Sequence, residues 1–205
     1  DINFSKLHKY VENYCIFKKS KILYDSILIP KLDEVTNNFI EILSQENQNI
    51  FDIASLINMF EFGIQNLRKI FQYLERSYIY ANRIDGFSKI SDIEYNLCRK
   101  KFLNQIPING LPNDAISLLI FQIKAQINIF RCTSDDEYIE HTKSEIKEAM
   151  KTVLSFIDEI GLYDSHVLPQ LIEQTSQFYS SVSNEMPFND FLGWLSTSKE
   201  KEMEL

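Results

Sequence analysis

Residues 50–78 read IFDIASLINMFEFGIQNLRKIFQYLERSY, and their apolar residues recur at helical spacing. Side chains three and four residues apart share one side of an α-helix. The pattern therefore predicts one helix over residues 50–82. Its inward stripe is expected to comprise Leu56, Met59, Phe60, Gly63, Leu67, Ile70, Phe71, Leu74 and Tyr78. Gly63 costs about 1 kcal/mol relative to alanine in such a helix, and a glycine there usually permits close approach of another helix.

Similar periodic runs lie on both sides of this stretch. They predict helices over residues 4–17, 21–44, 89–106, 114–131, 140–160 and 169–183. Pro30 lies inside the second run and should kink or break it, because proline removes a backbone hydrogen bond. Gly161 is expected to end its helix in the left-handed conformation, and Pro169 suits the first turn of the next. Since only five Gly and five Pro punctuate the chain, the fold is predicted to be all-α.

A firm break falls at residues 107–112, which read PINGLP. It divides the chain into two predicted helical parts, residues 1–108 and 109–205. Both parts contain several helices of comparable length, which favours stacked helical bundles, although no sequence period is evident. The chain begins with Asp1 rather than methionine, which indicates a fragment of a longer protein.

Charge and cysteine content exclude several classes of function. The net charge of −8 opposes binding to nucleic-acid phosphates or anionic lipids. Cys15, Cys98 and Cys132 lack paired spacing, which indicates a reducing compartment rather than a disulfide framework or zinc site. No apolar run approaches 18 residues. A transmembrane segment is therefore not expected.

Motifs for catalysis are missing from the sequence. No glycine-rich phosphate loop occurs, and His8, His141 and His166 are isolated, so no metal and no cofactor is expected. Each cysteine lies on an apolar helix face, where a buried structural thiol is the common case. An enzyme built on a helical bundle stays open as an alternative. It would need a pocket in which Cys98, His141 or His166 meets acidic neighbours.

Acidic residues are interpreted as structural or solvated. Asp135-Asp136 should lie in a loop and Asp158-Glu159 on a helix surface. Glu75-Arg76 follows an apolar run, and we interpret it as an ion pair that fixes its helix to its neighbours.

The helix over residues 4–17 carries apolar residues that binding could use. Phe4, Leu7, His8, Val11, Tyr14 and Cys15 share one side. Leu7, Val11 and Tyr14 suffice to hold a short helix on a bundle, which leaves Phe4 and His8 projecting from its flank. An exposed apolar knob beside polar groups is a common binding surface. Spacing alone does not separate this reading from packing on a preceding segment.

Several stretches, in order along the chain, resemble the N-terminal domain of the cullins, scaffolds of multisubunit ubiquitin ligases. Residues 4–15 (FSKLHKYVENYC) look like the first-repeat helix, and residues 21–24 (KILY) like the opening of the next. Residues 70–78 (IFQYLERSY) resemble the signature Tyr-Leu-Asp-Arg-x-Tyr. The last matches are Leu162-Tyr163, then Thr175 and Tyr179, then Phe191-Leu192 with Glu200 and Glu202. Residues 11–13, Cys15 and Tyr24 look most similar to the cullin-4 branch.

The resemblance implies cullin repeats stacked into an elongated stalk, with no catalytic residues in this part of the chain. A substrate adaptor would dock on the first helix and on the distal part of the helix over residues 50–82. Carried over by position, the adaptor-binding residues are Phe4, Leu7, His8, Val11, Glu12, Asn66, Lys69 and Tyr73. The RING protein would bind only the C-terminal half of such a protein. The implied location is the nucleus and cytoplasm.

The sequence departs from the family pattern at three positions. A common tryptophan is Ile57 here, the aspartate of the signature is Glu75, and a common tyrosine is His8. The resemblance to the cullin-4 branch implies an adaptor built of three β-propellers. Since His8 lies on the docking helix, an adaptor of the BTB type remains an alternative, as does an unrelated helical interaction protein.

Overall fold

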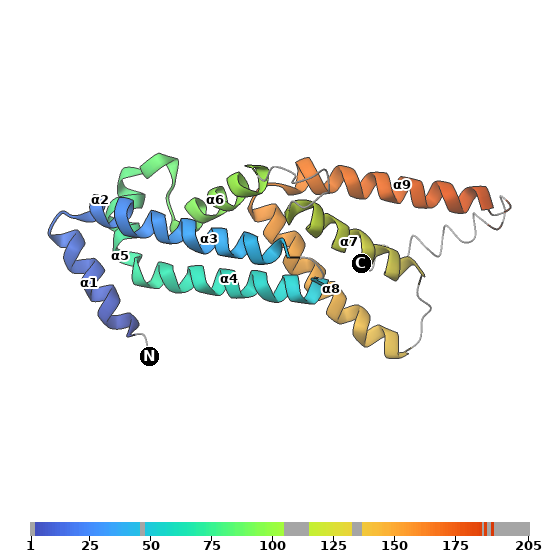
Figure 1. The fold of residues 1–205 in the computed structure, drawn as a ribbon, viewed down its shortest axis with the longest axis horizontal. Coiled ribbons are helices and arrows are strands. Elements are labelled where there is room, and N and C mark those ends of the chain that lie inside the picture. The colour runs from blue at the N-terminus through green and yellow to red at the C-terminus, as the bar shows by residue number, and fades with distance from the viewer. Residues whose placement is uncertain are drawn as a thin grey trace. The chain divides into compact units, whose positions relative to one another are not determined.

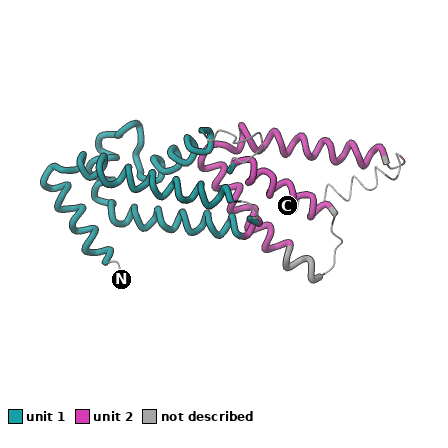
Figure 2. Tube along the Cα trace, viewed as in Figure 1, with its two compact units in different colours: residues 1–48, 52–115 teal, residues 49–51, 116–205 magenta. Residues whose placement is uncertain are grey.

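The computed structural model describes residues 3–45, 48–104, 115–132, 137–185, 187 and 190, with backbone alone at 132, 137–142 and 185. The regular structure of these residues is helical, without a strand (Figure 1), so the all-α prediction is confirmed. Contacts divide the chain into two compact units (Figure 2). Unit 1 comprises residues 1–48 and 52–115, and unit 2 comprises residues 49–51 and 116–205. The boundary predicted at 108/109 lies outside the described residues.

Unit 1 is a helical bundle around an aliphatic core. Its elements are α1 (Phe4–Ile16), α2 (Ser20–Leu23), η1 (Tyr24–Leu28), α3 (Ile29–Leu43), α4 (Ile50–Ile70), α5 (Gln72–Leu74), η2 (Glu75–Tyr80), η3 (Ile84–Gly86) and α6 (Ile90–Asn104). Helices α3 and α4 run side by side (Figure 1), and the ring of Phe39 stacks on that of Phe60 with centroids 4.2 Å apart. Helix α6 packs on α3, where Lys101 Nζ lies 2.6 Å from Asp33 Oδ1.

Unit 2 contains α7 (Ala115–Cys132), α8 (Glu137–Glu159), η4 (Tyr163–Val167) and α9 (Leu168–Glu185). Gly161 follows α8 at φ 70° and donates its N–H to the Asp158 carbonyl at 2.8 Å. Pro169 lies in the first turn of α9. Both predictions for these residues are confirmed. The core of unit 2 includes Leu119, Ile123, Val153, Phe156 and Ile157.

Among the described residues, three π-helical turns interrupt the α-helices, at η1, η2 and η4. In each turn region, two buried residues lie five positions apart: Leu23 and Leu28, Leu74 and Ile79, Leu162 and Val167. An α-helix turns residues five apart well away from each other, whereas i→i+5 bonding brings them closer to one side. The apolar spacing therefore explains why these turns are wide.

Pro30 does not break the helix that contains it. The backbone stays helical through Leu28 and Ile29, and Pro30 takes a place in the first turn of α3. The irregularity lies one turn earlier in η1, where the Ile29 N–H donates to the Tyr24 carbonyl. A proline ring would clash with the carbonyl four residues before it, and the wide turn relieves this crowding.

The structure reveals an internal repeat that we had not found in the sequence. Residues 23–30 (LYDSILIP) and 162–169 (LYDSHVLP) are identical at five of eight positions. Each copy contains a buried leucine, a π-turn that starts at tyrosine, and a proline in the following first turn. The same separation of 139 residues also pairs Phe39 with Phe178. The two units therefore share a local folding motif.

The predicted helix over residues 50–82 is corrected in three respects. It is interrupted at Phe71, whose φ of −95° and ψ of 14° leave the helical range. Met59 is 69% exposed, because Ile57, Phe60 and Ile64 fill the inward side of α4. A Cβ at Gly63 would meet no atom within 4 Å, so the close approach expected there is absent from the described residues. On α6, Leu103 is also exposed, although its apolar neighbour Phe102 is buried.

The described cysteines are buried structural thiols, as predicted. Cys15 and Cys98 are both buried. Burial, and then the nearby Glu94, raises the pKa of the Cys98 thiol, so the nucleophilic thiolate is disfavoured. Asp158 and Glu159 lie on the exposed surface of α8, also as predicted. Cys132 and His141 have no described side chains, and Asp135 and Asp136 lie outside the described residues.

Candidate functional site

Helix α1 is closed by side-chain and backbone bonds at both ends. Asn3 Oδ1 accepts the Lys6 N–H at 3.0 Å, which caps the first turn. At the other end, the Lys18 N–H donates to Cys15 O and the Lys19 N–H to Tyr14 O, both at 3.0 Å. This is a Schellman motif, with Lys18 in the left-handed conformation at φ 58°. The caps define a short helix of fixed length.

Only a small part of α1 is buried, and this corrects our expectation. Val11 and Cys15 are its buried residues. Leu7 and Tyr14, which we expected to hold the helix, are 39% and 46% exposed. The helix packs on α5 and on α2, which are short elements of three and four residues.

His8 joins α1 to the end of α4. Its Nδ1 lies 3.1 Å from the carbonyl oxygen of Lys69. A carbonyl can only accept, so the proton of this bond sits on Nδ1 and Nε2 is the acceptor of the neutral ring. The family resemblance implied that His8 and Lys69 share one face. The structure brings these two residues together.

The remaining predicted site residues belong to α1, to the last turns of α4 and to α5. Phe4 is 45% exposed on the first turn of α1. Lys69 is exposed, while Asn66 and Tyr73 are half-buried near the junction of α4 and α5. The family resemblance assigns Phe4, Leu7, His8, Asn66, Lys69 and Tyr73 to adaptor binding, and we call these six residues the docking face. Glu12 is half-buried. Val11 is buried within unit 1, so it helps to hold α1 on the bundle.

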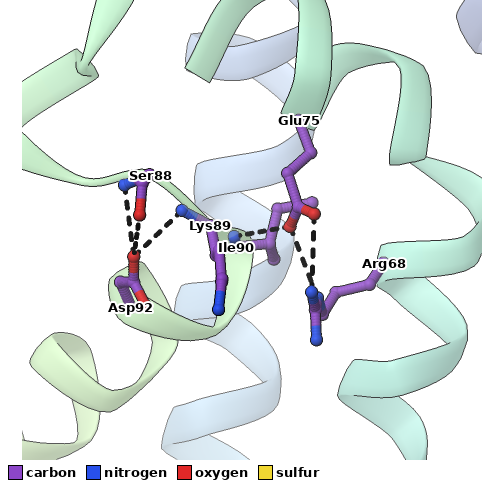
Figure 3. A network of polar contacts seen from close by, with 6 residues as sticks. All are labelled: Arg68, Glu75, Ser88, Lys89, Ile90 and Asp92. Atoms are coloured by element: carbon purple, nitrogen blue, oxygen red, sulfur yellow. Dashed lines mark hydrogen bonds and ion pairs between the residues drawn. The ribbon is translucent and has the colours of Figure 1, made fainter. Parts of the chain in front are cut away.

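A polar network anchors the wall of the docking face that α4 and α5 provide (Figure 3). Glu75 Oε2 lies 3.3 Å from Arg68 Nε and accepts the Ile90 N–H at 2.8 Å. Asp92 Oδ2 accepts from Ser88 and from the Lys89 N–H, which caps the start of α6. Glu75 therefore links η2 to α4 and α6, which agrees with the predicted role. The predicted ion pair with Arg76 is wrong in its partner, because Glu75 pairs with Arg68 and Arg76 is exposed.

A second contact fixes the chain that follows η2. The Tyr24 hydroxyl donates to Asp85 Oδ2 at 3.4 Å, and the Tyr24 and Tyr78 rings lie 5.8 Å apart. Burial, and then the charge of Asp85, raises the pKa of Tyr24 to about 12. Tyr24 therefore stays a neutral donor at physiological pH. Together with the Glu75 network, it holds α5 and η2 against the bundle.

Two helices carry exposed apolar residues that were not predicted to be exposed. On α1 and its C-cap, Leu7, Tyr10, Tyr14 and Phe17 follow one another at i, i+3, i+7 and i+10 and are all exposed. On α4, Met59 and Phe62 are exposed. The helical spacing on α1 was visible in the sequence. It was overlooked because Leu7 and Tyr14 had been assigned to the buried side.

The described residues contain neither a cluster of metal ligands nor a helix that could span a membrane. No three of their His, Cys, Asp or Glu side chains gather where they could hold a metal ion. His166 Nδ1 lies 2.7 Å from Ser165 Oγ, a neighbour in the chain. Within the same residues, no helix is both long and apolar enough to cross a bilayer.

Comparison with known proteins gives one match. The family model described as the cullin alpha solenoid domain matches residues 1–204. No curated protein and no solved structure matches the chain. The match covers both units and agrees with their helical bundles.

Proposed function

We propose that this chain, which belongs to the cullin family, is the part of a cullin-RING ubiquitin ligase scaffold that binds a substrate adaptor through the docking face. The observation that carries the proposal is the bond between His8 and the Lys69 carbonyl. It joins the two helices whose residues the family resemblance assigns to adaptor binding. The role is that of a scaffold subunit without chemistry of its own, in the nucleus and cytoplasm.

The exposure of α1 supports binding through this helix. A helix held by two buried side chains leaves much of its surface to a partner. Phe4 and Leu7 are large apolar side chains that remain exposed on it. Burying such anchors in a partner's groove is the helix-in-groove mode of recognition, in which a few residues carry most of the binding energy.

The rigid attachment of the α4 and α5 part of the docking face supports the same function. Glu75, Arg68 and Ile90 tie α4, η2 and α6 together (Figure 3). A ligase scaffold raises the effective concentration of substrate and enzyme by holding them in place. A binding surface that is fixed to the bundle holds the bound adaptor in a defined position, whereas a loose segment would not.

The adaptor that we propose is built of three β-propellers, in keeping with the similarity to the cullin-4 branch. A BTB-type adaptor is the competing partner. Mixing the chain with each purified adaptor and resolving the mixture by size-exclusion chromatography separates the two. Co-elution with the BTB protein alone would replace the propeller adaptor in the proposal.

A double substitution tests the docking face itself. Phe4→Ala with His8→Ala removes an exposed anchor and the link to Lys69. We expect adaptor affinity to fall by about 100-fold or more, as when two binding hot spots are lost. The matched control is Ile42→Ala with Tyr80→Ala, which removes exposed apolar side chains from α3 and η2 of the same unit.

Circular-dichroism melting separates binding from folding in this test. Since Phe4 and His8 are not buried, the melting temperature of the double variant should stay near that of the wild type. Adaptor binding that survives in the double variant would show that the docking face is wrongly placed. Equal loss in the control variant would do the same.

A further inference from the structure

Helix α1 and its C-cap residue Phe17 carry a second exposed stripe, which starts at Leu7 of the docking face and continues through Tyr10, Tyr14 and Phe17. Tyr10 is 54% and Phe17 is 74% exposed. Residues at i, i+3, i+7 and i+10 form one continuous ridge on a helix. Tyr10 lies two positions beyond His8, and two residues turn a helix by about 200°. The stripe therefore extends to the side of α1 away from the bond between His8 and Lys69.

Lysines accompany this stripe. Lys6 Nζ lies 5.9 Å from the centroid of the Tyr10 ring, and Lys19 Nζ lies 5.6 Å from that of Tyr14. Lys18, beside Lys19, is also exposed. Among the described residues, no carboxylate forms an ion pair with any of these three lysines. We call the four stripe residues together with Lys6, Lys18 and Lys19 the Tyr–Lys ridge.

The charge around the ridge is opposite to that of the chain. Residues 3–19 contain four lysines and one acid, Glu12, for a net charge of +3, while the whole chain carries −8. Glu12 lies two positions beyond Tyr10, so about 200° of helical turn separates it from that ring. Ammonium groups and tyrosine hydroxyls are hydrogen-bond donors. A surface of hydrogen-bond donors and apolar rings is complementary to a partner surface that contains carboxylates beside apolar side chains.

We propose that the Tyr–Lys ridge binds an acidic surface of the adaptor, so that the adaptor clasps α1 from two sides. This inference rests on the proposed function. It adds a second contact surface on α1 and the chemistry of the adaptor surface that would bind it. The remainder of the chain is strongly acidic and would repel a nucleic acid or an anionic membrane as a whole. A protein partner can confine its acidic groups to the ridge, where charges within a Debye length of about 8 Å still attract.

The test measures how fast the adaptor associates as ionic strength changes. The variant Lys6→Glu, Lys18→Glu, Lys19→Glu should associate with the adaptor about tenfold more slowly at low salt. Added salt should reduce the association rate of this variant less than it reduces that of the wild type. The matched control is Lys89→Glu, Arg99→Glu, Lys100→Glu, which changes the net charge equally at exposed positions outside α1. It should keep the wild-type rate to within about twofold.

A milder variant guards against misfolding. Lys18→Gln with Lys19→Gln removes two charges without adding acids at the end of α1, and it should lower the rate less than the triple reversal. A circular-dichroism spectrum like that of the wild type shows that α1 is intact in each variant.

The outcomes distinguish this inference from the proposed function. An adaptor that binds every variant at one rate overturns the ridge and leaves the docking face standing. Equal slowing in the control triple also overturns it, since net charge alone would then act. Co-sedimentation of the wild type with phosphatidylserine vesicles, with unchanged adaptor kinetics, would assign the ridge to a membrane instead. If no adaptor binds at all, the proposed function fails and the ridge inference falls with it.

Discussion

Residues 23–30 and 162–169 form the same turn in the two units but meet different partners. In unit 1, Tyr24 is buried, with its hydroxyl on Asp85 and its ring near Tyr78. In unit 2, Tyr163 is half-buried and lines a groove with Lys151 and Leu154. The local residues therefore determine the shape of the turn, while the elements packed on it determine how deeply its tyrosine is buried.

The residues downstream of the two prolines differ in the same way. Phe39 is buried and stacks on Phe60 of α4. Phe178, at the equivalent position, is half-buried beneath the guanidinium of Arg131, 4.6 Å from its ring centroid. A repeated sequence can thus serve a closed core in one unit and a polar-edged surface in the other. Substitutions at equivalent positions of the two units can separate the effects of the repeated local sequence from the effects of the elements packed on it.

The largest difference is expected at the two phenylalanines. Phe39→Ala leaves a cavity between α3 and α4 and should lower the free energy of unfolding by about 3–5 kcal/mol. Phe178→Ala should cost only about 1 kcal/mol, because the ring is half-buried and its contacts include surface contacts with Arg131 and Tyr179. Urea unfolding followed by circular dichroism measures both values. Equal losses would show that the two positions are packed alike.

A smaller difference is expected at the two tyrosines. Tyr24→Phe removes a buried hydroxyl and should cost about 1 kcal/mol at neutral pH. The folded-state pKa of Tyr24 is raised to about 12, while the unfolded side chain ionises near its ordinary value of about 10. The stability that neutral Tyr24 contributes is therefore complete below about pH 10 and is lost as pH rises toward 12.

The cost of Tyr24→Phe should accordingly shrink across that alkaline range. Urea unfolding at a series of pH values measures the change. The matched control is Tyr163→Phe, which keeps Tyr24 and should keep the alkaline loss of stability. A cost of Tyr24→Phe that is the same at every pH would contradict the link between burial and ionisation.

The smallest effects are expected at the two prolines, which belong to the shared part of the motif. Pro30→Ala and Pro169→Ala should each cost less than about 1 kcal/mol, mostly by freeing the unfolded chain. The two costs should agree, because both prolines follow a π-turn in the same first-turn position. Thermal unfolding of both variants checks this. Changes of opposite sign would show that context rather than local sequence controls the turn.

The helices that the sequence predicted best are those with strong periodicity and clear end signals. The pattern over residues 140–160, the glycine at 161 and the proline at 169 placed α8 and α9 correctly. The interruption at Phe71 and the wide turn at η2 both escaped prediction, because the α-helical period of the apolar residues runs through them. The wide turn had a signal of its own in apolar residues five positions apart, Leu74 and Ile79.

The candidate site was predictable through family resemblance rather than through chemistry. Motif positions brought His8 and Lys69 to one face, yet no spacing rule could show that the histidine ring bonds a backbone carbonyl across 61 positions. The exposure of Leu7 and Tyr14 was missed for a physical reason. A short helix has too few neighbours to bury every apolar residue on its side, and the sequence does not say which neighbours exist.

The shallow seating of α1 has a consequence for how such a protein can change over evolutionary time. Val11 and Cys15 are its only buried side chains, so most positions on the helix can be substituted at little cost to the bundle. Under the proposed function, the residues that contact a partner and the residues of the core would be under separate selection. A lineage could then exchange one partner for another by altering the exposed side of a single short helix, while the rest of unit 1 stays the same.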